Sequence, residues 1–178
     1  MNIIITSAGF ENKGAEAMLR MVQVQLTKRL PSVELFLWRA LRANSQFALA
    51  SGINSLNLPF ESPEYKWSFL GKRIGKMLWI LREVFQNNDL RKLLVLFDKK
   101  NSFALACNNY IIRTVGGFSA LVDISGYAYG NVGWATDSIL SIQPLINICN
   151  QLNKPVFSYR RPGEVLIILL LNNLFVNS

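Results

Sequence analysis

The chain has 178 residues, of which 51% are hydrophobic, and 19 Lys and Arg against 11 Asp and Glu give it a formal net charge of +8. This length and hydrophobic content support one buried core and exclude a mainly disordered protein. No run approaches the ~20 apolar residues of a membrane span, no basic leader opens the chain, and histidine is absent, so we predict a cytoplasmic protein without a metal site.

The chain opens with a predicted strand, a glycine-bearing loop and a helix. Ile3, Ile4 and Ile5 form an apolar run without polar alternation, which is typical of a parallel strand covered on both faces. Helical spacing begins at Ala17. The loop between them, residues 9–16, lies at the carboxyl end of the strand, where open α/β sheets bind ligands and where a helix start favours an anion or a sugar hydroxyl. It contains neither G-x-G-x-x-G nor a P-loop, which argues against NAD and ATP.

A second strand, predicted at residues 33–38, gives the strand–helix–strand order of a right-handed crossover in a parallel sheet. A short helix at 39–51 and an extended segment at 53–58 follow. Residues 67–85 predict an amphipathic helix with one apolar stripe. The stripe consists of Leu70, Ile74, Met77, Leu78, Leu81, Val84 and Phe85.

Two interpretations of this helix stay open. Either its stripe packs on the sheet, or the helix rests on an anionic bilayer surface through Trp67, Phe69, Trp79 and neighbouring lysines. Residues 66–100 hold nine basic and three acidic residues, with further helices predicted at 89–97 and 101–113. This excess favours an anionic partner such as a membrane surface. No nucleic-acid motif accompanies it, so we do not expect nucleic acid as a partner.

A strand predicted at residues 118–125 leads into a second glycine-rich loop, 123–134, followed by a helix at 138–152 and a strand at 154–157. Loops that follow parallel strands share one edge of the sheet, so we expect the two loops to form one cleft. Polar groups there would bind sugar hydroxyls, and aromatic rings would pack on sugar C–H faces. The residues assigned to this cleft are Gly9, Asn12, Lys13, Gly14, Glu16, Asp123, Ser125, Gly126, Tyr127, Tyr129 and Gly130.

These cleft residues also have structural explanations. Gly9 and Gly14 could serve only the turn, Glu16 only the first turn of the helix, and Asp123 a helix cap. The two cysteines, Cys107 and Cys149, have no metal-site spacing and are expected to be buried free thiols.

The two glycine loops together resemble the polysaccharide pyruvyl transferase family. The segments concerned are Gly9-Phe10-Glu11-Asn12-Lys13-Gly14-Ala15-Glu16-Ala17-Met18-Leu19 and Asp123-Ile124-Ser125-Gly126-Tyr127-Ala128-Tyr129-Gly130. The resemblance implies a GT-B-type fold of two Rossmann-like halves facing a cleft. It implies transfer of pyruvate from phosphoenolpyruvate to a sugar hydroxyl in cell-surface polysaccharide synthesis, with no cofactor. The acceptor would be a saccharide or a lipid-linked saccharide.

The chain departs from this family after residue 157. Family members are longer, and their donor-binding basic residues and a histidine proposed as the acid lie in a second half. We therefore expect residues 1–157 to form a Rossmann-like acceptor-side domain, incomplete and inactive alone. Residues 158–178 are interpreted as an aberrant or truncated tail from a disrupted reading frame, with a natural terminal element as the alternative.

Two other functions stay open. The chain could be half of a GT-B-like glycosyltransferase that uses a nucleotide sugar. It could also be a non-catalytic basic module that binds a partner, or a membrane surface, through residues 66–100. In the membrane case the protein would lie at the inner face of the membrane.

Overall fold

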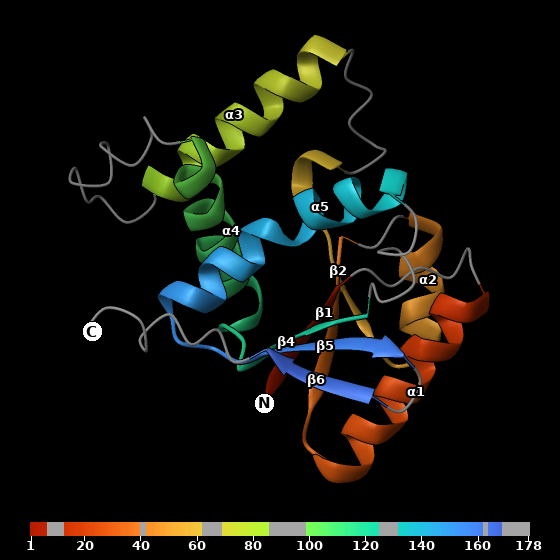
Figure 1. Cartoon of the computed structure of the whole chain (residues 1–178). Coiled ribbons are helices and arrows are strands. Elements are labelled where there is room, and N and C mark those ends of the chain that lie inside the picture. The colour runs from red at the N-terminus through yellow and green to blue at the C-terminus, as the bar shows by residue number, and fades with distance from the viewer. Residues whose placement is uncertain are drawn as a thin grey trace, which may run out of the picture.

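A six-stranded sheet forms the centre of the protein (Figure 1). The structure is a computed structural model that describes residues 1–6, 13–39, 42–61, 69–85, 99–124, 132–161 and 164–168. The strands are β1 (Asn2–Thr6), β2 (Glu34–Trp38), β3 (Asn54–Leu56), β4 (Ala120–Asp123), β5 (Val156–Arg161) and β6 (Glu164–Ile168). Their order is β3-β2-β1-β4-β5-β6; β1 to β5 are parallel, and β6 is antiparallel to β5. This arrangement confirms the predicted Rossmann-like α/β class.

Helices cover both faces of the sheet (Figure 1). They are α1 (Lys13–Arg29), α2 (Arg42–Ala50), α3 (Phe69–Phe85), α4 (Lys99–Val115) and α5 (Val132–Gln151), with a short 3₁₀ helix η1 (Pro59–Glu61). The uninterrupted apolar run of β1 packs against helices on both faces of the sheet, because successive side chains of a strand point to opposite faces. Ile3 and Ile5 join the core beneath α1 and α2, whereas Ile4 joins the core beneath α4 and α5.

Two helices begin earlier than the sequence pattern predicts. Helix α1 starts at Lys13 rather than at Ala17, and α5 starts at Val132 rather than near residue 138. The apolar spacing marks only the part of a helix that packs on the core, so a first turn that extends past the sheet carries no such signal. Lys13, Gly14 and Glu16 therefore belong to the first turn of α1. The helix predicted at 89–97 lies outside the described residues.

Helix α3 is the outermost helix and packs against α4 and η1 (Figure 1). Its orientation differs from both sequence interpretations. Ile74, Met77 and Leu78 of the predicted stripe are exposed, whereas Trp79 is buried at 7% exposure. The prediction that Trp79 rests on a bilayer is therefore wrong. Among the described side chains of the stripe, Val84 is buried and Leu81 is half-buried, whereas Phe85 is exposed like the other three.

Left-handed backbone turns return the chain from helices to strands. Gly52 after α2 and Asn153 after α5 have φ values of 76° and 50°. In each turn the next residue donates its N–H to a carbonyl five residues earlier, Ile53 to Ala48 at 2.9 Å and Lys154 to Cys149 at 2.8 Å. These Schellman turns end the helices and direct the chain into β3 and β5.

Strand β5 extends past residue 157 to Arg161, and β6 pairs with it, Phe157 lying opposite Ile167. The predicted domain boundary at 157 therefore falls inside a strand. Residues 169–178 lie outside the described residues, and an aberrant origin for the tail stays a prediction. None of the described helices is long and apolar enough to cross a membrane.

Candidate functional site at the strand-order reversal

Three buried polar residues lie side by side on three neighbouring strands, at the last residues of β1 and β4 and inside β5. Thr6 of β1 is 0% exposed, and Asp123 of β4 and Ser158 of β5 are each 4% exposed. Thr6 is the register partner of Asp123, and Asp123 is the register partner of Ser158. The three residues, which we call the polar row, therefore form one continuous line across the sheet.

All three side chains of the polar row lie on the same face of the sheet. The residues two positions earlier in the strands, Ile4, Leu121 and Val156, belong to the core beneath α4 and α5. Because side chains two residues apart in a strand point the same way, the polar row also faces α4 and α5. On this face, a hydroxyl, a carboxylate and a hydroxyl therefore follow the apolar core layer of β1, β4 and β5.

The polar row lies where the strand order reverses. From β1 the chain goes outward to β2 and β3 on one side, and from β4 it goes to β5 on the other. Open α/β sheets bind ligands outside the carboxyl ends of strands at such a point. Strands β1 and β4 are neighbours, so the segments that leave them start from the same edge. This confirms the prediction that the two glycine loops leave from one edge.

A hydrogen bond joins two members of the polar row. Thr6 Oγ1 donates to Asp123 Oδ1 at 3.3 Å, within the buried layer. This distance is longer than the usual ~2.7–2.8 Å of an O–H···O bond. A carboxylate beside two hydroxyls supplies both acceptors and donors for a polyhydroxylated ligand.

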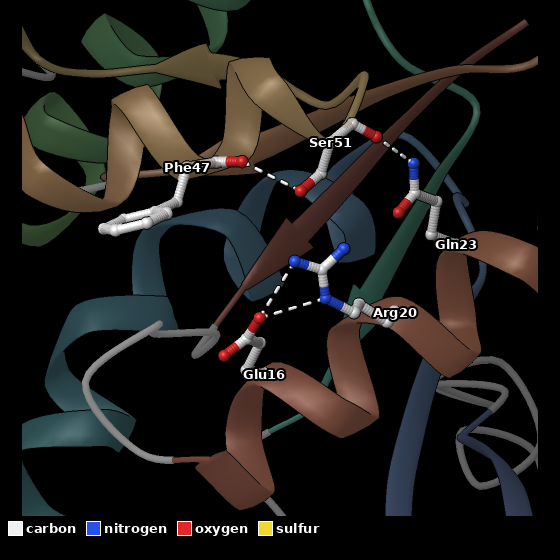
Figure 2. A network of polar contacts seen from close by, with 5 residues as sticks. All are labelled: Glu16, Arg20, Gln23, Phe47 and Ser51. Carbon is white, nitrogen blue, oxygen red and sulfur yellow. Dashed lines mark hydrogen bonds and ion pairs between the residues drawn. The ribbon is translucent and has the colours of Figure 1, made fainter.

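The first turn of α1 contributes charged groups to the same edge. Glu16 Oε1 accepts hydrogen bonds from Arg20 Nε at 3.0 Å and from Arg20 Nη2 at 2.9 Å. Figure 2 shows the two side chains facing each other on one side of the helix. Lys13 and Gly14 are exposed at the start of the helix. Arg20, missed in the sequence analysis, was detectable from its spacing four residues after Glu16.

The neighbouring contacts in Figure 2 fix α1 against α2. Gln23 Nε2 donates to the backbone carbonyl of Ser51, and Ser51 Oγ donates to the carbonyl of Phe47 at 2.9 Å. The first bond joins the middle of α1 to the residue that follows α2, and the second closes the last turn of α2 on itself.

Many of the assigned cleft residues lie outside the described residues. These are Gly9, Asn12, Ser125, Gly126, Tyr127, Tyr129 and Gly130. Among the described segments, no group of three or more His, Cys, Asp or Glu side chains is placed to hold a metal ion.

The sequence analysis missed two members of the polar row, Thr6 and Ser158. Both directly follow a short apolar run, as Asp123 does, in Ile-Ile-Ile-Thr, Val-Phe-Ser and Leu-Val-Asp. A polar residue directly after the apolar run of a buried parallel strand is the signal that could have found them.

Comparison with known proteins found no matching family model, curated protein or solved structure. The functional assignment therefore depends on the chain's own residues. What the described residues establish is a Rossmann-like sheet whose strand order reverses beside a buried carboxylate flanked by two hydroxyls.

Proposed function

We propose that the chain is the acceptor-side half of a sugar-modifying transferase and that the polar row binds hydroxyl groups of a saccharide. The observation that carries the proposal is the alignment of Thr6, Asp123 and Ser158 in register at the strand-order reversal. A carboxylate between two hydroxyls offers acceptors and donors at the spacing of neighbouring strands, which suits a ligand with adjacent hydroxyls.

Among such transferases, we favour a polysaccharide pyruvyl transferase of GT-B-like organisation. Its support is the resemblance of residues 9–19 and 123–130, the two segments that begin at the ends of β1 and β4. Ketal formation needs two hydroxyls of one sugar, which suits a row with three polar positions. One hydroxyl proton goes to the methylene carbon of phosphoenolpyruvate, both oxygens bond to its C2, and phosphate leaves with the other proton.

In this proposal Asp123 accepts a hydrogen bond from the attacking hydroxyl, and Lys13 lies near an anionic group. Phosphoenolpyruvate would bind to basic residues of a second half, so the chain alone has no turnover. We place the protein in the cytoplasm, where phosphoenolpyruvate is formed. The acceptor is a saccharide or a lipid-linked saccharide.

Saturation-transfer NMR with a panel of neutral hexosides and disaccharides tests saccharide binding by the isolated chain. We expect Asp123→Asn and Ser158→Ala to weaken the transfer signal at least fivefold. Ser102→Ala is the matched control, because Ser102 is a serine of α4 buried to 5% exposure that does not belong to the polar row. Absence of any saccharide signal, or an equal loss in Ser102→Ala, would refute the proposal.

Two further measurements separate the pyruvyl transferase from its alternatives. Thermal stabilisation by UDP or GDP, without an effect of saccharides, would favour a nucleotide-sugar glycosyltransferase half. Steady release of phosphate from phosphoenolpyruvate by the chain alone would contradict the proposed dependence on a second half.

A further inference from the structure

A tryptophan extends the line of the polar row by one strand. Ile5 of β1 is the register partner of Leu37 of β2. The residues that follow them in these parallel strands, Thr6 and Trp38, therefore lie at the same level of the sheet. Trp38 is the last residue of β2, as Thr6 is of β1. The line thus crosses four neighbouring strands, from β2 to β5.

Trp38 shares the face of the polar row. Phe36 and Trp38 of β2 both belong to the core beneath α4 and α5, which also contains Ile4 of β1. Side chains two residues apart in a strand point to the same face, and Thr6 follows Ile4 by two residues. The indole of Trp38 and the hydroxyl of Thr6 therefore extend from the same face of adjacent strands.

The indole N–H of Trp38 is a buried donor without a hydrogen-bond partner. The residue is 5% exposed, and within the described part of the chain its Nε1 has no acceptor. An indole N–H can only donate. A buried indole usually has a partner, because leaving its N–H without one costs about 1–3 kcal/mol. Trp38 thus supplies a donor that the described fold does not use, on the same face as the polar row.

A second buried indole in the same core lies away from the polar row. Trp79 of α3 is 7% exposed, and among the described residues its Nε1 also has no hydrogen-bond partner. Its ring is arranged edge to face with those of Phe103 and Tyr110, with centroids 6.2 Å and 5.9 Å away. An aromatic face can accept an N–H weakly. The place of Trp38 in line with the polar row is therefore what relates its donor to a ligand.

We propose that Trp38 is a binding residue of the same site and that its N–H donates to an acceptor oxygen of an oligosaccharide. This role of Trp38 rests on the proposed function, because it requires saccharide binding by the polar row. From β2 to β5 the line crosses three strand spacings, which is ~14 Å at ~4.8 Å each. One hexose ring is much shorter than this. A ligand that contacts both Trp38 and Ser158 therefore contains at least two sugar units.

The order of the groups fixes how such a ligand lies. Trp38 supplies only a donor, whereas the carboxylate of Asp123 supplies only acceptors. The sugar unit over β1 and β4 would direct a hydroxyl proton to Asp123. The unit over β2 would direct a ring, glycosidic or hydroxyl oxygen to the indole. The extended row thus favours an oligosaccharide over a free monosaccharide.

Saturation-transfer NMR titrations with paired ligands test the Trp38 contact. Each methyl hexoside is compared with the methyl glycoside of a disaccharide that has the same hexose as its terminal unit. Trp38→Phe keeps an aromatic ring but removes the N–H. We expect it to weaken disaccharide binding about fivefold, since one hydrogen bond is worth about 1 kcal/mol, and to leave hexoside binding unchanged. Trp79→Phe is the matched control, because it removes the other buried indole N–H, and it should change neither affinity.

A second measurement uses the unchanged chain and so does not depend on the folding of Trp38→Phe. The chain has four tryptophans, and isotope labelling of their indole nitrogens gives N–H resonances that single Trp→Phe variants assign. A saturating disaccharide should shift the Trp38 resonance downfield and leave that of Trp79 in place.

The outcomes separate the role of Trp38 from the proposed function. If saccharides bind and Asp123→Asn weakens them, the proposed function stands. In that case a fixed Trp38 resonance, or a Trp38→Phe variant that weakens both ligands equally or neither, would overturn the role of Trp38 alone. If no saccharide binds, both proposals fail.

Discussion

The ion pair between Arg113 and Glu83 gives a direct test of how α3 is held. Arg113 Nη2 lies 2.7 Å from Glu83 Oε1, and the two side chains are 44% and 1% exposed. Arg113→Met keeps much of the aliphatic length but leaves the buried carboxylate of Glu83 without its cation. The double variant Arg113→Met/Glu83→Met removes both charges.

The expected magnitudes follow from burial. Removing one partner of a fully buried pair costs about 3–5 kcal/mol, but water screens the half-exposed guanidinium, so we expect a loss of about 1.5–3 kcal/mol for Arg113→Met. The double variant should recover most of this loss, because it leaves no buried charge. Asn109 Nδ2 donates to the Glu83 carbonyl at 2.8 Å and continues to join α4 to α3 in both variants.

Urea unfolding, followed by circular dichroism and by fluorescence of the buried Trp38 and Trp79, measures these free energies. The control is Arg20→Met on α1, which removes an exposed ion pair of similar length, 2.9 Å, with side chains 53% and 33% exposed. It should change the free energy of unfolding by less than ~0.5 kcal/mol. The reasoning fails if Arg113→Met lies within that range, or if the double variant is less stable than the single one.

Three further predictions concern other parts of the described fold. Burial raises the pKa of the Cys149 thiol to about 12, although the positive charge of Lys154 lowers this pKa in part. Thiol reagents at pH 8 should therefore label Cys149 only after the protein unfolds. Because the folded state favours the neutral thiol, this thiol should leave the free energy of unfolding unaffected below pH ~9. Above that pH it should lower the free energy by up to ~1.4 kcal/mol per pH unit, and Cys149→Ala should reduce the slope by this contribution. Asn153 has a φ of 50°, a left-handed conformation that glycine adopts without strain. In urea unfolding, Asn153→Gly should therefore raise the free energy of unfolding by about 0.5–1 kcal/mol, and Asn153→Val should lower it. Trp79→Ala should cost about 3–5 kcal/mol and Leu78→Ala less than ~0.5 kcal/mol; the reverse order in urea unfolding would show that α3 is turned the other way.

Local sequence patterns predicted the strands and the shared edge well. Apolar runs such as Ile3, Ile4 and Ile5 identify strands covered on both faces, and the strand–helix–strand order limits how they can pair. The prediction that β1 and β4 present their carboxyl ends together needed nothing beyond this parallel order. It is the part of the candidate site that the sequence could supply.

The orientation of α3 could not be predicted in the same way. Helical periodicity shows which residues share a side, but not whether that side meets the protein or the solvent. The deciding contacts of Trp79 come from Phe60, Phe103 and Tyr110, which are distant in sequence. Glu83, which the sequence places among polar positions, is instead buried through its pairing with Arg113.

Ser158 links the candidate site to the domain boundary. Its side chain is buried to 4% exposure and is the register partner of Asp123. If Ser158→Ala weakens saccharide binding as predicted, the proposed site extends into β5, past the boundary that the sequence predicted at residue 157. Unchanged binding in Ser158→Ala together with a loss in Asp123→Asn would limit the proposed site to β1 and β4.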